Sequence, residues 1–342
     1  MVQKGDNVER AHLLVEMARV AEQLEETGKA LSLYDDALSQ FTEDSGDPFL
    51  VEVLRWKGTV HRERGETEAA FRCYTRSLEK ARLIESERAQ AHALNCLGTV
   101  AQRRCEHKET ERLYAEASAL ASKAGDSRLL GMIEQNRGVL ASMRGDYAQA
   151  AAFYSNSLGA FEMACDAEPM SWVLNNLGIL HTKIRNFGEA RDYLERGLAI
   201  AVNRSDTVVE NVIKLNLAEV WLGLGSLEVA DECCAEALDQ AQKRGDHLSA
   251  AGALKIRAAI ERQRGALDKS IATLRIAIYE AEEAEDRLLH AEMLRELGEI
   301  SRAVGNSGAA RSAWREAVHS YETIGANQEV AEVQAKLGLL PG

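Results

Sequence analysis

The sequence repeats a pattern of small residues every forty positions over most of its length. One column of the pattern holds only glycine or alanine, and a second column, twelve residues later, holds alanine in six of its eight places. The first column is Ala18, Gly58, Gly98, Gly138, Gly178, Ala218, Ala258 and Gly298. The second is Ala30, Ala70, Thr110, Ala150, Ala190, Ala230, Ser270 and Ala310. Such regularity predicts a linear array of similar units, in which each unit is stabilised by its neighbours.

A third column, seven residues after the first, marks a turn inside each unit. Glycine occupies it at Gly65, Gly145, Gly225, Gly265 and Gly305, and the other residues there are Glu25, Cys105 and Arg185. Glycine ends helices because it tolerates the left-handed backbone conformation. We therefore expect one helix before this column and a second helix after it.

Apolar residues have helical spacing on both sides of the turn. With units numbered from residue 11, position 10 is always aliphatic, and positions 3, 4, 7, 8, 10, 11 and 14 cluster on one side of a helix. The position-10 residues are Val20, Val60, Val100, Leu140, Leu180, Val220, Ile260 and Ile300. A second apolar-periodic segment follows the turn, as in residues 150–161. Each unit is thus predicted to be a helical hairpin.

Helix-capping residues recur where the next unit's first helix would begin. Serine and aspartate side chains accept hydrogen bonds from the free N–H groups of a first helical turn. The column reads Ser86, Asp126, Asp166, Asp206, Asp246 and Asp286. Aromatic residues make up only 5% of the chain and there are three prolines, a composition that favours helices over sheets.

These features together resemble the tetratricopeptide repeat. The resemblance is carried by Leu-Gly at positions 7 and 8, the turn glycine, alanine at 20, an aromatic at 24 and a small–aliphatic pair at 27 and 28. The position-24 aromatics are Tyr34, Tyr74, Tyr114, Tyr154 and Trp314, with Leu194, Cys234 and Leu274 in the other units. The period exceeds the common length of about 34 residues, and is similar to the long repeats of kinesin light chains, spindle-orientation adaptors and bacterial Rap or MalT-type regulators.

The resemblance implies an all-α fold, a right-handed α-solenoid superhelix of eight antiparallel helix pairs whose first helices line the concave face. We expect the units to span 11–50, 51–90, 91–130, 131–170, 171–210, 211–250, 251–290 and 291–330. Residues 331–342 would form a partial ninth unit with a capping helix, and residues 1–10 an N-terminal tail.

The concave face can be predicted from the helical wheel. Positions 2, 5, 6, 9, 12 and 13 of each first helix point away from the apolar stripe. In the units that begin at residues 91, 131 and 171 these positions hold no carboxylate and are rich in amides. The amides predicted to bind a peptide backbone are Asn95, Gln135, Asn136, Asn175, Asn176 and Asn216. An amide side chain both donates and accepts, so it can pair with an extended peptide; the alternative is that these amides bond only between helices.

Aromatic and basic residues on the same face extend the candidate site. Trp56 and Trp172 are predicted anchors for a partner, with packing on a neighbouring helix as the alternative. The basic residues Arg55, Arg62, Arg103 and Lys183 are predicted to take carboxylates of an acidic segment, with a solvated surface role as the alternative.

Several classes of function are disfavoured. The net charge of -13 repels phosphate backbones and anionic membranes, so nucleic acid and membrane are not expected partners. The sequence has no phosphate-binding loop, no dinucleotide fingerprint and no H-E-x-x-H motif, and its six cysteines form no C-x-x-C pair. We therefore expect no enzyme activity, no metal and no cofactor, in a cytoplasmic protein with reduced cysteines.

Two functions remain. The first is a scaffold or adaptor that binds an extended, acidic or amide-rich peptide segment of a partner protein in the concave groove. The second is a regulatory sensor in which a signal peptide or small ligand changes the superhelix. Self-association through the partial ninth unit is a further expectation, since apolar residues in "LGLLPG" would be left uncovered.

Overall fold

The computed structural model describes residues 2–42 and 46–340, which form an all-α repeat fold. The described residues contain seventeen helices and no strand. The first compact unit, Met1–Pro169, holds the helices α1 Val2–Gln23, α2 Thr27–Leu38, α3 Pro48–Glu63, α4 Thr67–Leu83, α5 Glu87–Arg103, α6 His107–Lys123, α7 Ser127–Met143 and α8 Tyr147–Met163.

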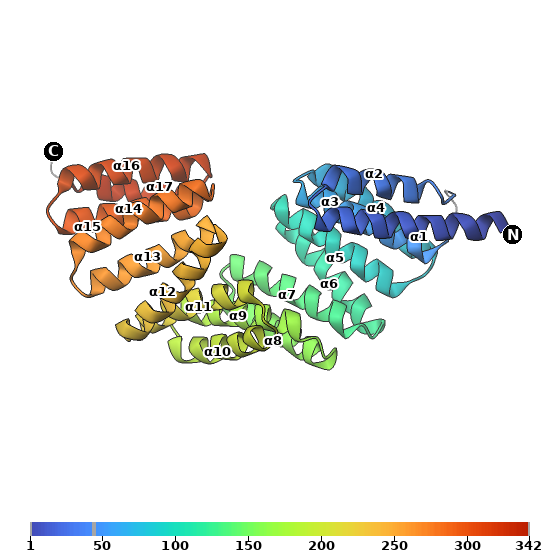
Figure 1. Ribbon diagram of the computed structural model, residues 1–342, viewed down its shortest axis with the longest axis horizontal. Helices are drawn as coiled ribbons and strands as arrows, with labels where there is room; N and C mark the ends of the chain where they lie inside the picture. Colours follow the sequence, from blue (N-terminus) through green and yellow to red (C-terminus); the bar gives the residue numbers. More distant parts are fainter. Residues whose placement is uncertain (1, 43–45, 341–342) are drawn as a thin grey trace. The chain divides into compact units, whose positions relative to one another are not determined.

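The second compact unit, Met170–Gly342, continues the pattern (Figure 1). It holds most of α9 Ala167–Lys183, then α10 Phe187–Asn203, α11 Thr207–Gly223, α12 Leu227–Arg244, α13 His247–Gln263, α14 Leu267–Glu283, α15 Arg287–Ala303, α16 Ser307–Thr323 and α17 Asn327–Gly338. Odd-numbered helices from α5 onward begin forty residues apart, as the sequence predicts. The expected helix pairs and the extra C-terminal helix are therefore present.

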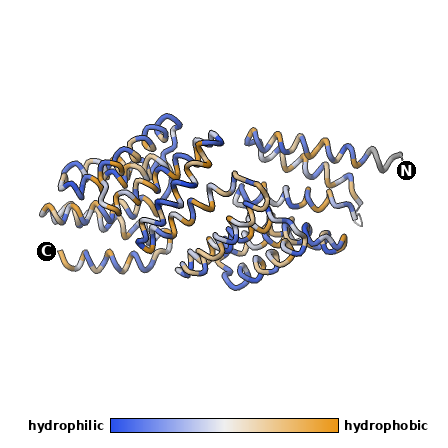
Figure 2. The backbone as a smooth tube through the Cα atoms, turned by 90° about the horizontal axis from the view of Figure 1, so that it is seen from below, coloured by the Kyte–Doolittle hydropathy of each residue, from blue (hydrophilic) through white to orange (hydrophobic). Residues whose placement is uncertain are grey.

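Each pair buries the predicted apolar stripe. Hydrophobic and hydrophilic residues alternate along the helices in both compact units (Figure 2). The position-10 residue is buried in every first helix from α3 onward, at Val60, Val100, Leu140, Leu180, Val220, Ile260 and Ile300. Val20 of α1, by contrast, is 54% exposed. Within each compact unit, first helices contact the second helix of the preceding pair as well as their own partner, as α5 contacts both α4 and α6.

The two helices of a pair approach most closely at the position-8 glycine. A methyl group at Gly98 would lie 2.4 Å from Cε1 of Tyr114, and one at Gly138 would lie 2.5 Å from Cδ1 and Cε1 of Tyr154. The position-24 ring therefore occupies the space that a side chain on the facing helix would need. This contact explains why small residues repeat at position 8.

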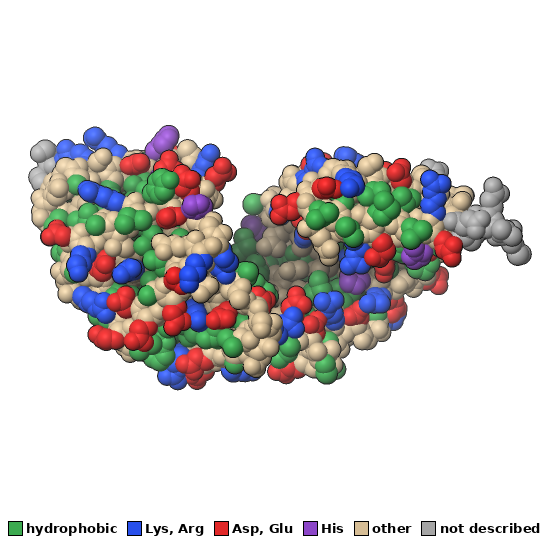
Figure 3. Space-filling model, in the orientation of Figure 1, with side chains coloured by type: hydrophobic (Ala, Val, Ile, Leu, Met, Phe, Trp, Pro, Cys, Tyr) green, Lys and Arg blue, Asp and Glu red, His purple; other side chains and the backbone are tan. Residues whose placement is uncertain are grey.

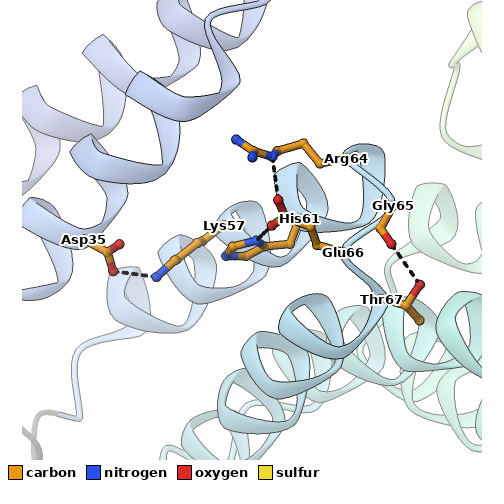
Figure 4. Close-up of polar contacts among 7 residues, drawn as sticks. All are labelled: Asp35, Lys57, His61, Arg64, Gly65, Glu66 and Thr67. Carbon is orange, nitrogen blue, oxygen red and sulfur yellow. Dashed lines mark hydrogen bonds and ion pairs between the residues drawn. The ribbon is translucent and has the colours of Figure 1, made fainter.

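The turns take the left-handed conformation whichever residue is present. Gly65 has φ +76°, and Cys105 and Arg185 have φ +59° and +61°. In the turn between α3 and α4, Glu66 accepts a hydrogen bond from Arg64 Nε at 2.8 Å and lies 2.5 Å from His61 Nδ1 (Figure 4). The hydrogen bond with His61 lowers the pKa of the Glu66 carboxyl group. The left-handed conformation in this column therefore does not require glycine, since Cys105 and Arg185 adopt it as well.

The predicted capping residues begin the first helices. Each cap side chain accepts a hydrogen bond from the N–H three residues later, at Ser86, Asp126, Asp206, Asp246 and Asp286. These residues lie five positions before the first residue of each expected unit, so each first helix begins four residues inside the preceding forty-residue segment. The α1 helix also begins earlier than expected, at Val2, within the segment assigned to a tail. None of the described helices has the length and apolar character needed to cross a membrane.

Oppositely charged side chains are interspersed over the surface of both compact units (Figure 3). Some ion pairs connect successive repeats, such as Arg88 with Asp126 at 2.7 Å and Arg128 with Asp166 at 2.5 Å. Exposed pairs of this kind contribute little, about 0–1 kcal/mol each. The array is therefore stabilised mainly by its apolar columns.

Replacing Gly138 by Ala is expected to destabilise the first compact unit by about 1–3 kcal/mol, the usual cost of overpacking. The reason is the overlap of the added methyl group with the Tyr154 ring. Gly159→Ala is the matched control, because a methyl group there would meet nothing within 4 Å. Alanine in that open helical position should instead stabilise by about 0.5–1 kcal/mol. Urea unfolding followed by circular dichroism measures both, and equal shifts would contradict the close approach at Gly138.

Candidate functional site

The predicted concave face consists of positions 2, 5, 6, 9, 12 and 13 of the first helices, here called the first-helix face. Its amides do not all point to solvent. Asn95 on α5 and Asn175 on α9 are only 6% and 3% exposed. Gln135, Asn136, Asn176 and Asn216 are half-buried. Position 5 is therefore more enclosed than position 6 where both carry asparagine.

The buried amides bond to the amides of the next repeat. In the first compact unit, Asn136 Nδ2 donates to Asn95 Oδ1 at 3.0 Å. In the second, Asn216 Nδ2 donates to Asn175 Oδ1 at 2.7 Å. The same position-5 to position-6 pair thus joins neighbouring first helices in each compact unit. Because each position-6 amide donates only one of its two N–H bonds in the pair, it retains hydrogen-bonding capacity.

The two tryptophans are half-buried rather than fully presented to solvent. Trp56 lies at a ring-centroid distance of 6.0 Å from Phe49, edge to face, and the guanidinium groups of Arg19 and Arg55 lie 5.6 Å from its ring. Trp172 packs against the apolar cluster that contains Leu194 and Ile213. Both rings thus combine packing within the chain with a partly accessible edge.

The basic residues of the first-helix face differ in exposure. Arg103 and Lys183 are exposed, whereas Arg55 and Arg62 are half-buried. Arg103 Nη1 donates to the carbonyl oxygen of Arg62 at 2.8 Å, so it bridges α5 and α3. Arg62 also lies 3.6 Å from Glu63. The structure therefore brings Arg62 and Arg103 together at one end of α3 and α5.

A small cavity of about 180 Å³ opens between α3 and the start of α5. Its lining includes Glu52, Arg55, Arg88 and His92. Burial, with the positive charge of Arg55, lowers the pKa of His92 to about 4. His92 is therefore neutral at physiological pH, and the charged groups around it are carboxylate and guanidinium. The helical wheel placed Arg55 on the first-helix face, but the sequence did not predict the cavity that Arg55 shares with His92.

The described chain offers no metal centre, since no group of three or more His, Cys, Asp or Glu side chains is arranged to hold an ion. The six cysteines are free. Cys234 is buried, donates to the Ala253 carbonyl oxygen at 2.9 Å, and has its pKa raised to about 12 by burial. This cysteine packs as a core residue.

Residues 89–163 and 136–201 match the model of the tetratricopeptide repeat. The matched part of the chain, residues 89–201, therefore consists of tetratricopeptide repeats. The resemblance inferred from the Leu-Gly, alanine and aromatic columns is thereby confirmed. No curated protein sequence matches the chain.

Solved structures share the repeat fold. The apo form of the quorum sensor NprR from B. thuringiensis has a TM-score of 0.71 at 13% identity, covering 91% of this chain and 87% of that one. The apo form of RapI has a TM-score of 0.62 at 16% identity, covering 80% and 98%. A Rap protein complexed with Competence and Sporulation Factor has a TM-score of 0.58 at 16% identity, covering 87% and 76%. At these identities the similarity shows a common fold.

A double-mutant cycle of Asn95→Ala and Asn136→Ala is expected to give a coupling free energy of about 0.5–1.5 kcal/mol, the net value of one hydrogen bond. The single Asn95→Ala change should destabilise because it removes the acceptor of a half-buried amide. Urea unfolding of the four proteins measures the coupling. A second cycle of Asn95 with Asn156, which is exposed on α8, serves as the control and should give none. Equal coupling in the two cycles would contradict the pair.

The neutral His92 predicts a loss of stability in mild acid. The unfolded chain takes up a proton on this histidine near its ordinary pKa of about 6.5, whereas the folded chain does so only near 4. Between these values the unfolded state binds more protons, so the free energy of unfolding falls as the pH falls. His92→Gln should make this part of the pH profile shallower in urea titrations. An unchanged slope would show that other groups determine it.

Proposed function

We propose that this repeat array is a protein-interaction module that binds an extended peptide segment of a partner along its first-helix face. The repeat fold and its similarity to Rap and NprR structures support an interaction module in general. The observation that carries the finer proposal is that the position-6 amides are half-buried and that buried asparagines hold two of them, Asn136 and Asn216.

The amide pairs would preorganise peptide recognition. Buried Asn95 fixes the side chain of Asn136 by a hydrogen bond, and buried Asn175 does the same for Asn216. A side chain already held in place loses less conformational entropy when it binds. The buried Asn95 and Asn175 therefore support the site, and the half-buried position-6 amides Asn136, Asn176 and Asn216 are the proposed contacts with peptide N–H and C=O groups.

Charge favours an acidic or amide-rich segment. Carboxylates are absent from the first-helix face of α5, α7 and α9, whereas Arg103 and Lys183 are exposed there. Arg62 lies beside Arg103, and Arg55 lies in the cavity with His92. These groups would pair with carboxylates of the segment, while the accessible edges of Trp56 and Trp172 would contact its apolar side chains.

A regulatory sensor is the second candidate. NprR is described as a quorum sensor, and the Rap structure contains Competence and Sporulation Factor. A comparable role for this chain would require the bound segment to change the conformation of the array. Small-angle scattering with and without a bound peptide distinguishes the two candidates, since an adaptor is expected to give superimposable curves.

The test replaces Asn136, Asn176 and Asn216 together by Ala. A phage-displayed library of unstructured peptides rich in Asp, Glu and Asn is selected on the unmodified protein, and the affinities of the selected peptides are then measured by fluorescence polarisation. Loss of three hydrogen bonds of about 1 kcal/mol each should weaken binding at least tenfold. The reason is that each amide contributes a separate contact along the segment.

The matched control replaces three exposed amides of second helices, Gln149, Asn203 and Gln242, by Ala. Their loss should leave the peptide affinity unchanged. Both triple variants are compared at a temperature at which circular dichroism shows them folded. Equal affinity of the first-helix variant and the unmodified protein would show that these amides serve only the contacts between repeats.

A further inference from the structure

Two packing columns of the array are broken at the same place. Position 4 is leucine in six units, and position 28 is aliphatic in seven. The position-4 residues are Leu14, Leu54, Leu94, Glu134, Leu174, Lys214, Leu254 and Leu294. The position-28 residues are Leu38, Leu78, Ser118, Leu158, Leu198, Leu238, Ile278 and Val318. Ser118 on α6 and Glu134 on α7 thus introduce polar atoms where the other units mostly pack aliphatic side chains.

These two departures meet in space. Ser118 Oγ donates to Glu134 Oε1 at 2.6 Å, and Arg137 Nη1 lies 2.8 Å from the same oxygen. Glu134 is only 3% exposed. Its second oxygen, Oε2, is buried and has no hydrogen-bond partner within the described residues. An ionised carboxylate has acceptor capacity on both oxygens, so half of this group's capacity is unused.

A second charged residue at position 4, Lys214, shows that a charged side chain at this position can find partners within the chain. Lys214, at position 4 of its own unit, lies 2.9 Å from Glu210 and 2.8 Å from Glu236. Its charge is thus compensated twice by the chain itself. Among the residues that the structure describes, Glu134 pairs with one cation, Arg137, whose Nη1 lies 2.8 Å from Oε1.

Glu134 lines an open groove of about 720 Å³ whose lining residues come from the second helices α6 and α8 and from the first helix α7. The walls carry small side chains, among them Ser118, Ala119 and Gly159, and Met163 lies at one edge. A methyl group at Gly159 would meet nothing within 4 Å. The groove therefore combines a mostly apolar lining, free volume and one incompletely bonded carboxylate, and an apolar lining with a few polar groups is also found in small-ligand sites.

We propose that this groove binds a primary ammonium group carried on a short apolar stem, with the ammonium donating to Glu134 Oε2. An ammonium–carboxylate hydrogen bond is stronger than a neutral one, and the net charge of -13 attracts cations to the protein. Oε2 is buried in the structure. The carboxyl group must therefore rotate about its terminal torsion to reach the ligand, and this torsion is soft in glutamate. The stem lies between the small residues of α6 and α8.

Methyl NMR with ¹³C-methyl methionine tests the site directly. Met163 at the groove is the reporter, and Met17 on α1 is the internal control. The probe is n-butylamine at constant pH and ionic strength, and n-butanol is its uncharged counterpart. The Met163 methyl resonance is expected to shift saturably with n-butylamine. The affinity for n-butylamine should be at least tenfold higher than for n-butanol, because the alcohol cannot form the charged hydrogen bond. Met17 should not shift.

A peptide arm distinguishes the source of the ammonium group. The probe Ac-Gly-Lys-Gly-NH₂ presents the same group as a lysyl side chain of a partner protein. Tighter binding of the peptide than of n-butylamine would assign the groove to a protein lysine, and the reverse would assign it to a free amine. Either order supports the ammonium site.

Two variants keep the proposal falsifiable. The double change Ser118→Leu and Glu134→Leu restores both aliphatic columns, so it should fold at least as stably and lose the response of Met163. Glu134→Gln keeps the shape and should abolish the preference for amine over alcohol. The proposal is overturned if Met163 does not respond to either amine at tens of millimolar, if the alcohol binds equally well, or if the folded Leu-Leu variant still responds.

Discussion

The contact between the position-8 residue and the position-24 side chain sets the distance between the two helices of a pair, and the rest of the array depends on that distance. Gly298 faces the large ring of Trp314, and Gly178 faces Leu194. Where position 24 carries the smaller Cys234, position 8 is Ala218. The two columns mostly compensate one another in volume, which is what close packing at near-crystalline density requires. Because the distance between the two helices stays similar from pair to pair, each pair presents a similar apolar surface to the next. The same packing therefore repeats along each compact unit.

The fold was predictable because this rule leaves a visible period in the sequence. Small, aliphatic and capping residues recur in columns, and the helices follow them. The turns were predictable only in part. Cys105 and Arg185 adopt the left-handed conformation without glycine, and so do Glu85 and Ser205 in the turns between units. The turns between units have no continuous glycine column in the sequence. Tertiary packing on both sides of each turn imposes the left-handed conformation even on residues that do not favour it.

The candidate site was less predictable than the fold. A helical wheel assigned Asn95 and Asn175 to the open face because it considers one helix in isolation. In the structure, the neighbouring first helix covers position 5 and supplies an amide partner from position 6. Burial on this side is determined by residues about forty positions away, so the face of a single helix cannot reveal it. The repeat register did separate position 5 from position 6, and that distinction corresponds to the buried and half-buried members of each pair.

Departures from the columns carry information that the columns themselves cannot. In an array, the stability of each compact unit is close to a sum of local terms, so one interface can lose apolar contact without unfolding the others. That tolerance allows Glu134 and Lys214 to occupy a position that is otherwise leucine. A buried charge is nevertheless costly unless the chain satisfies it. Lys214 has two carboxylate partners, whereas the second oxygen of Glu134 has none among the described residues and lies at a groove with free volume. Both residues occupy position 4 of the repeat, yet only the charge of Lys214 is compensated twice within the chain. This contrast is the physical reason to propose that a ligand completes the site at Glu134.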